Sequence, residues 1–206
     1  MTAPTVPTAA GAAVPSAWRA RLAHAAEAEG LLDVTYRVVA TPVGDVLVAA
    51  AESGVLRVAF EVQGHGLALE ELAATVSPRV LAGGRRLDPV VRQLDEYFAG
   101  ARTRFDVPLD LRLVHGFRGE VVRRLGSVPY GTTVTYAGLA AATGRPAAVR
   151  AVGTACARNP LPLLLPCHRV VRSDGAPGQY AGGAAAKRTL LDLERSTTLA
   201  TADPGA

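Results

Sequence analysis

Three short apolar runs follow one another near the start of the chain and limit how this part can fold. Residues 35–40, 46–51 and 55–60 are rich in β-branched or small apolar side chains, and tight turns separate them. Such runs predict antiparallel strands joined as a meander. Residues 88–98 carry apolar side chains at helical spacing, and residues 104–107 favour one more strand. This region is therefore predicted to be a small α+β unit.

Helical spacing replaces the short strands after about residue 110. Phe117, Val121 and Leu125 fall on one face of a predicted helix. Residues 136–142 and 147–158 predict two further helices around the turn 143–146, with Pro146 in the first turn of the second helix. Two short helices around a glycine turn are typical of a helix-turn-helix, although an ordinary helical hairpin has the same pattern.

These patterns divide the chain into four segments. Residues 1–31 are expected to be a disordered or partly helical tail, with a helix over residues 16–29. Residues 32–110 form the predicted α+β domain, and residues 111–195 form a mainly helical domain. Residues 196–206 are rich in Ser, Thr and Ala and are expected to be a disordered tail.

Charge is distributed unevenly between the two predicted domains. Of the 22 basic and 18 acidic side chains, 11 basic and 4 acidic ones lie between residues 111 and 194, which gives this segment +7 and the rest −3. This asymmetry predicts a polyanionic partner for the C-terminal domain.

Composition sets the expected environment of the chain. No apolar run of about 18 residues predicts a membrane span, and residues 1–15 lack the order of a signal peptide. Two cysteines and four histidines show neither a disulfide framework nor zinc spacing. We therefore expect a cytoplasmic protein without membrane contact, metal or organic cofactor.

One thiol stands out by its neighbours. Cys167 follows a proline and an apolar run and directly precedes His168. A neighbouring base can generate the reactive thiolate. Adjacent side chains on an extended strand point to opposite faces, so cooperation needs a turn or a bridging water. A buried, inert cysteine is the alternative interpretation.

The motif Pro166-Cys167-His168-Arg169-Val170 resembles the signature of the 6-O-alkylguanine-DNA alkyltransferases, also called methylated-DNA–protein-cysteine methyltransferases. The resemblance spans about residues 34–194. It includes further segments in family register, which are 41–44, 94–100, 128–131, 135–136, 150–153, 159–160, 180–183, 187–188 and 190–194.

The resemblance implies a ribonuclease-H-like N-terminal domain and a C-terminal domain with a winged-helix-like helix-turn-helix. It implies irreversible, stoichiometric transfer of an alkyl group from 6-O-methylguanine in DNA, with 4-O-methylthymine as a further potential substrate. The implied catalytic residues are Cys167 as acceptor, His168 and Glu194 as its relay, Asn159 as orienting group and Tyr136 as donor to the leaving base. Taken singly, Glu194 also fits a solvated helix end, Asn159 a turn cap and Tyr136 a packing aromatic.

The same resemblance implies that the target base is flipped out of double-stranded DNA through the minor groove by a monomer. Arg150 would fill the vacated space, although a phosphate contact is the simpler interpretation of one arginine. The implied DNA-contacting residues are Tyr136, Arg145, Arg150, Ala151, Gly153 and Ser173. The implied base pocket comprises Tyr136, Val170, Tyr180, Ala181 and Gly182.

Two other classes of function remain to be separated from transfer. A lesion-binding sensor would lack the acceptor cysteine, which is present here, and a transcriptional regulator would carry an additional cysteine-rich zinc domain. The chain departs from the family pattern at Val122, Arg172 and Pro177. We expect Val122 to alter packing, Arg172 to add a phosphate contact and Pro177 to stiffen the pocket loop.

Overall fold

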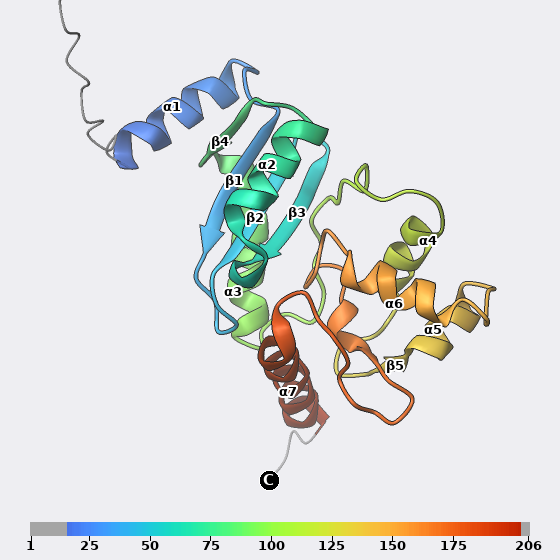
Figure 1. Ribbon diagram of the computed structural model, residues 1–206. Helices are drawn as coiled ribbons and strands as arrows, with labels where there is room; N and C mark the ends of the chain where they lie inside the picture. The colour runs from blue at the N-terminus through green and yellow to red at the C-terminus, as the bar shows by residue number, and fades with distance from the viewer. Residues whose placement is uncertain (1–15, 203–206) are drawn as a thin grey trace, which may run out of the picture.

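The computed structural model describes residues 16–202, which form a sheet domain and a helical domain packed side by side (Figure 1). Helix α1 (Ser16–Ala28) matches the helix predicted near the N-terminus. The rest of the predicted N-terminal tail, residues 1–15, lies outside the described residues. None of the helices within residues 16–202 is long and apolar enough to cross a bilayer.

The N-terminal domain is built on a four-stranded sheet with the order β3-β2-β1-β4. The predicted meander is confirmed, since β1 (Val34–Val39) pairs antiparallel with β2 (Val46–Ala51), and β2 with β3 (Gly54–Phe60). Strand β4 (Val80–Ala82), which was not predicted, pairs parallel with β1. Parallel neighbours need a crossover connection, and the missed helix α2 (His65–Thr75) provides it.

Both faces of this sheet are covered, which explains the wholly apolar β2. Every residue of β2 is buried. Val46, Val48 and Ala50 face a cluster that includes α3 (Asp88–Phe98), whereas alternate residues face the cluster of α2. The period of two along a strand sends successive side chains to opposite faces. The sheet is therefore the middle layer of the domain.

The helix predicted over residues 88–98 is confirmed as α3, but the strand predicted over residues 104–107 is wrong. That segment is a loop, and only Leu109 makes an isolated bridge, to Val55. Arg102 holds the loop by ion pairs to Glu96 and Asp106 at 2.7 and 2.9 Å. Side-chain interactions with α3 thus take the place of strand pairing.

The C-terminal domain is mainly helical, as predicted, and includes a helix-turn-helix. Pro146 lies in the turn before the second helix and not in its first turn, which corrects the expected position. A two-stranded parallel sheet flanks the helices. The elements are α4 (Gly116–Leu125), β5 (Val134–Thr135), α5 (Tyr136–Ala142), α6 (Val149–Ala157), β6 (Val170–Val171) and α7 (Gly183–Ala202).

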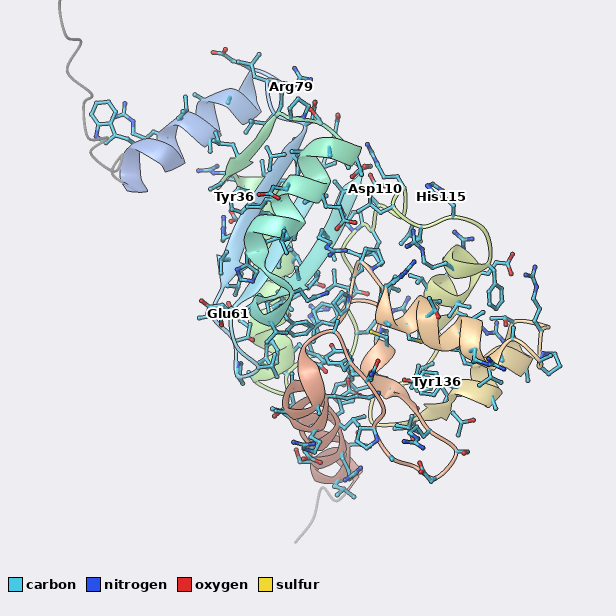
Figure 2. All side chains as sticks on the ribbon, viewed as in Figure 1. Tyr36, Glu61, Arg79, Asp110, His115 and Tyr136 are labelled. Atoms are coloured by element: carbon cyan, nitrogen blue, oxygen red, sulfur yellow. The ribbon has the colours of Figure 1, made fainter. Side chains whose placement is uncertain are left out.

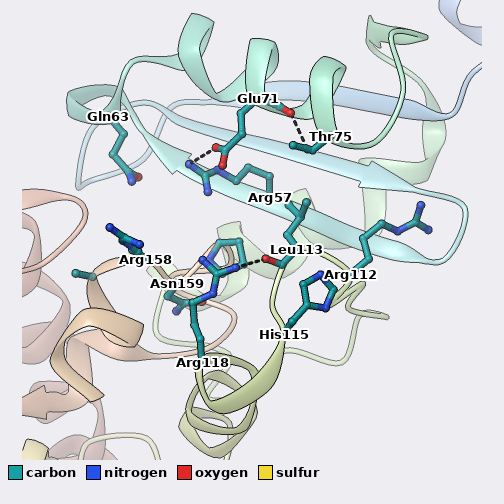
Figure 3. Close-up of a pocket in the computed structure, with 12 residues that line it drawn as sticks. Arg57, Gln63, Glu71, Thr75, Arg112, Leu113, His115, Arg118, Arg158 and Asn159 are labelled. Carbon is teal, nitrogen blue, oxygen red and sulfur yellow. Dashed lines mark hydrogen bonds and ion pairs between the residues drawn. The ribbon is translucent and has the colours of Figure 1, made fainter. Parts of the chain in front are cut away.

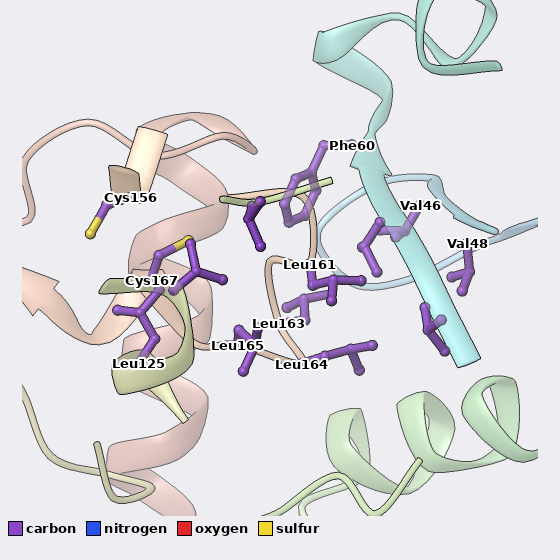
Figure 4. Close-up of a cluster of buried hydrophobic side chains, with 14 of the residues drawn as sticks. Val46, Val48, Phe60, Leu125, Cys156, Leu161, Leu163, Leu164, Leu165 and Cys167 are labelled. Carbon is purple, nitrogen blue, oxygen red and sulfur yellow. The ribbon is translucent and has the colours of Figure 1, made fainter. Parts of the chain in front are cut away.

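One hydrophobic core continues from the sheet into the helical domain. Figure 4 shows Val46, Val48 and Phe60 of the sheet facing the apolar segment Leu161–Leu165, which leads to Cys167. The backbone joins the domains as well, because the amide of Val58 donates to the carbonyl of Pro160 at 2.7 Å. The sheet therefore supports the segment that carries the thiol.

Helix α7 extends to Ala202, well into the segment expected to be a disordered tail from residue 196. The hydroxyls of Thr197 and Thr198 donate to carbonyls four residues earlier in the helix. These threonines also lie against two glycine turns. A Cβ added at Gly100 would press on Thr197, and one added at Gly131 would collide with Thr198. Tertiary packing thus overrides the low helix propensity of this stretch.

We expect Leu94→Ala to lower the free energy of unfolding by about 3 kcal/mol, because it opens a cavity in the shared core. Leu94 is fully buried in α3. The exposed Arg92 of the same helix provides the control, since Arg92→Ala should cost less than about 0.5 kcal/mol. Urea denaturation of both variants measures the difference, and equal losses would contradict the placement of α3.

Candidate functional site

A single 3-10 turn, Cys167–Arg169, presents the thiol and the imidazole together. Of the two arrangements expected here, a turn or a bridging water, the structure has the turn. Residues 159–171 are all buried, so the apolar run before Cys167 holds the turn inside the domain. The amide of Cys167 donates to the carbonyl of Leu165, and that of Arg169 to the carbonyl of Pro166. Cys167 itself is only 3% exposed.

Asn159 fixes the segment that leads into this turn. Its side-chain amide donates to the carbonyl of Leu165 at 2.7 Å, and its side-chain oxygen accepts from the amide of Leu161 at 3.0 Å. A hydrogen bond involving Asn159 also lowers the pKa of the Cys167 thiol against the opposing effect of burial. The side chain is therefore placed as expected for an orienting residue.

The carboxylate of Glu194, 1% exposed, is the most densely hydrogen-bonded group of the site. It accepts from Tyr97 Oη at 2.7 Å, His168 Nε2 at 2.8 Å and the Gly131 amide at 3.1 Å. The guanidinium of Arg169 adds Nε and Nη2, each at 2.9 Å. Burial alone would raise the pKa of Glu194, but the bonds from His168 and Arg169 lower it to about 2.

These contacts determine the tautomer of His168. An ionised carboxylate can only accept, so Nε2 must carry the proton that is shared with Glu194. Burial lowers the pKa of His168, although Glu194 opposes this effect, and the ring is neutral near neutral pH. Nδ1 then presents a lone pair, and it is buried without a partner among the described residues. A buried acceptor of this kind is suited to take a proton from a thiol or from a bridging water.

The thiol itself is protonated before reaction. Burial raises the pKa of Cys167 to about 11, while Asn159 and the cation of Lys187 act in the opposite direction. Cys156 lies in α6. Its burial, and to a smaller extent the charge of the nearby Cys167 thiolate, raise its pKa to about 12. Both thiols lie in the hydrophobic core, and only Cys167 directly precedes a histidine, within the same 3-10 turn.

Tyr136 lies beside a surface hollow of about 430 Å³ that is lined by one side of α6. Arg150 and Gly153 of α6 line the same hollow, so three of the residues implied by the resemblance meet there. Figure 2 shows Tyr136 within the helical domain, well apart from Tyr36 on the sheet. Burial raises the pKa of Tyr136, and the thiols of Cys156 and Cys167 raise it further, so its hydroxyl remains a donor.

The loop between β6 and α7 closes over this side of the turn. Gly178 approaches the hydroxyl of Tyr136, and a Cβ at Gly182 would come within 2.9 Å of the ring of Phe60. Tyr180 packs edge-on against Phe60 and His168, with ring centroids 5.3 and 6.1 Å away. Its hydroxyl is buried without a hydrogen-bond partner among the described residues.

Other residues implied by the resemblance lie at or near the surface or contact other elements. Ala151 and Ser173 are exposed, and Ala181 is partly buried. Arg145 stacks over Phe117 at 4.8 Å and lies 3.6 Å from Glu120, so it is partly engaged by α4. The family departure Arg172 is exposed and lies 3.8 Å from Asp174. The other departures are Val122, which is fully buried in the core, and Pro177, which lies in the loop.

Three residues that were not predicted to have a role complete the site. Tyr97 and Arg169 bind Glu194, and the fully buried Lys187 donates to the carbonyl of Val170 at 2.6 Å. This bond engages the backbone carbonyl of Val170, a residue of the implied base pocket. A signal for Lys187 existed, because this only lysine of the chain lies seven residues before Glu194 on one helical face.

A sheet domain joined to a helix-turn-helix domain with a buried thiol, a neutral imidazole and a carboxylate defines a DNA-binding protein equipped for thiol chemistry. Two family models match: the ribonuclease-like domain of 6-O-methylguanine DNA methyltransferase over residues 34–111, and its DNA binding domain over residues 116–196. The chain belongs to the methylated-DNA–protein-cysteine methyltransferase family.

Individual relatives agree with this assignment. The methylated-DNA–protein-cysteine methyltransferase of Mycolicibacterium paratuberculosis is 38% identical over 79% of this chain and 93% of its own length. The constitutive enzyme of Bacillus subtilis is 37% identical over 78% and 94%. The solved O6-methylguanine methyltransferase of Mycobacterium tuberculosis has a TM-score of 0.70 at 35% identity over 80% and 94%. The M. tuberculosis OGT in complex with DNA gives 0.68 at 36% over 79% and 94%.

The low pKa of Glu194 predicts a specific acid sensitivity. Since this pKa falls from 4.5 to about 2 on folding, the stabilisation is complete above pH 4.5 and is lost as the pH falls toward 2. The shift corresponds to about 3 kcal/mol. We expect Glu194→Gln to lose this part of the pH dependence of unfolding, measured by urea denaturation from pH 2 to 6.

The exposed Asp192, in the same turn of α7, supplies the control. Asp192→Asn should keep the acid sensitivity of the original protein. An unchanged pH profile in Glu194→Gln would show that this carboxylate is not ionised in the folded state.

Proposed function

We propose that this chain repairs alkylated DNA by direct reversal. It transfers the methyl group of 6-O-methylguanine in double-stranded DNA to Cys167, once per molecule and irreversibly. The observation that carries this proposal is the buried turn in which Cys167 adjoins a neutral His168 anchored by Glu194. The names of the relatives describe the same reaction. The alternative, a sensor that only binds lesions, is not favoured, because the acceptor cysteine is present beside a base.

The first step is removal of the thiol proton. Nδ1 of His168 accepts it through a bridging water, and Glu194 stabilises the resulting imidazolium. The thiolate then attacks the methyl carbon, so that an S–C bond forms as the C–O bond breaks. The bonding pair of electrons stays on the guanine oxygen, and the base leaves as an anion. The proton held by His168 passes through water to the guanine anion, and the product is a thioether with no free thiol, so each chain reacts once.

Three groups assist departure of the base. The hydroxyl of Tyr136 donates a hydrogen bond or a proton to the leaving guanine. Its raised pKa keeps this hydroxyl protonated until then. Tyr180, with the backbone of Ala181 and Gly182, forms a wall of the base pocket. Lys187 holds the carbonyl of Val170 and places a positive charge near the developing thiolate.

Access to the base requires that it leave the duplex. The α6 residues Ala151 and Gly153 are small, so this helix can enter a narrow minor groove. Arg150 then occupies the space of the extruded guanine, and a monomer suffices for the reaction. Arg145 and Ser173 supply further DNA contacts. A DNA complex has been solved for the M. tuberculosis OGT, a structural neighbour of this chain.

The acceptor is tested by intact mass after exposure to methylated duplex DNA. We expect the original protein to gain one methyl group at Cys167 and Cys167→Ala to gain none, while its affinity for DNA stays within about twofold. Cys156→Ala is the matched control and should still be methylated, since Cys156 has no base beside it. Methylation of Cys156 in Cys167→Ala would overturn the assignment.

Arg150→Ala separates base flipping from simple binding. Because extrusion of a base costs a few kcal/mol, we expect repair of duplex DNA to slow by about tenfold to a hundredfold. Reaction with free 6-O-methylguanine should hardly change, since that substrate needs no flipping. Rates on the two substrates, measured in single-turnover reactions, provide the comparison. Equal losses on both would show that Arg150 supports the pocket and does not act in extrusion.

A further inference from the structure

A second and larger cavity, of about 660 Å³, lies between the two domains, and Asn159 is the one residue of the thiol site among those that line it. Figure 3 shows that its walls come from the sheet domain, with Arg57 and Gln63, and from the helical domain, with Arg118 and Arg158. The linker between the domains adds Arg112 and His115. Four arginines thus surround one hollow at the domain boundary.

The acidic groups near this cavity neutralise only part of its charge. Arg112 is paired with the buried Asp110 at 2.7 Å, and Arg57 with the exposed Glu71 at 3.3 Å. Arg118 donates to the carbonyl of Leu113, which carries no charge. Within residues 16–202, neither Arg118 nor Arg158 has a carboxylate partner. The cavity therefore retains a net positive charge.

Arg57 is an unusual residue for a sheet that is covered on both faces. Its side chain is only 16% exposed, and its Nε is buried without a hydrogen-bond acceptor in the described part of the chain. Buried donors normally find a partner. The guanidinium group of arginine can donate to two oxygens of one phosphate group at once, whereas a carbonyl offers a single oxygen. The chemistry of the lining thus favours a phosphate ligand.

The cavity is continuous with the surface of α6. A neighbouring hollow shares His115, Arg118 and Arg158 with it and is also lined by Ala151 and Thr154 of α6. The bond from the Val58 amide to the Pro160 carbonyl fixes the sheet domain against the end of this helix. A phosphate chain that follows α6 would therefore pass Arg118 and Arg158 before it reaches Arg57.

We propose that this interdomain cavity binds phosphates of the DNA backbone, so that the N-terminal domain holds the DNA together with the helix-turn-helix. The inference rests on the proposed function, since it takes DNA to be the ligand of α6. It extends the DNA contact to Arg57 of the sheet domain. Free phosphate and nucleotides share this chemistry, and the experiment separates them from DNA.

The test is the salt dependence of binding to unmodified duplexes that are lengthened one base pair at a time. We expect Arg57→Gln and Arg118→Gln each to lower the slope of log affinity against log salt by about 0.9, the effect of one lost phosphate contact. The loss should appear only once the duplex is long enough to reach the cavity. Arg195→Gln, which alters an exposed arginine of α7, is the control and should leave the slope unchanged.

A second variant guards against misfolding of Arg57→Gln. Gln63→Glu has the same shape and keeps an acceptor for the amide of Phe60, but it adds a negative charge to the cavity. It should weaken binding to long duplexes without changing the melting temperature by more than a few degrees. If Arg57→Gln and Gln63→Glu both bind long duplexes like the original protein, the proposal is overturned.

Two further measurements separate this inference from its alternatives. The first is a titration with inorganic phosphate. If the original protein binds phosphate tightly, and Arg57→Gln loses this binding but keeps its affinity for DNA, the cavity binds a free anion and the DNA assignment is overturned. Methylation of Cys167 by the free base should be equal in the original protein, Arg57→Gln and Arg118→Gln. Absence of that reaction in the original protein would instead refute the proposed function.

Discussion

The buried carboxylate of Glu194 organises the site, because separate parts of the chain converge on it. Tyr97 comes from the sheet domain, Gly131 from the loop before β5, and His168 and Arg169 from the thiol turn. A charge that is 1% exposed is stable only if donors replace its lost hydration. This requirement couples α3, α7 and the turn, so that the position of the imidazole depends on the packing of both domains.

The same burial shifts the pKa values of Cys167 and His168 in opposite directions. It raises the pKa of Cys167 to about 11, which keeps the thiol protected when no substrate is bound. It lowers the pKa of His168, which keeps the ring neutral and able to accept a proton. The low-dielectric site therefore keeps the thiol protonated and the imidazole neutral, and in the proposed function the thiol becomes reactive when its proton moves to His168.

The N-terminal domain carries none of the groups that are proposed to react, yet its side chains contact the candidate site. Phe60 contacts Tyr180 and leaves room only for glycine at position 182, so the sheet shapes the wall of the proposed base pocket. The proposed phosphate cavity would give the same domain a role in holding DNA. Both effects depend on the close packing of β3 against the segment that follows α6.

Local patterns in the sequence determined the meander, helix α3, the helix-turn-helix and the motif around Cys167, because each depends on residues close together in the chain. The interaction of Glu194 with Tyr97 spans 97 positions, and that with Gly131 spans 63, so no local pattern predicts them. The loop at residues 104–107 and the helical end of α7 were likewise decided by side chains from other elements. Long-range packing selects among local preferences that differ by little in free energy, and only the tertiary structure reveals its choice.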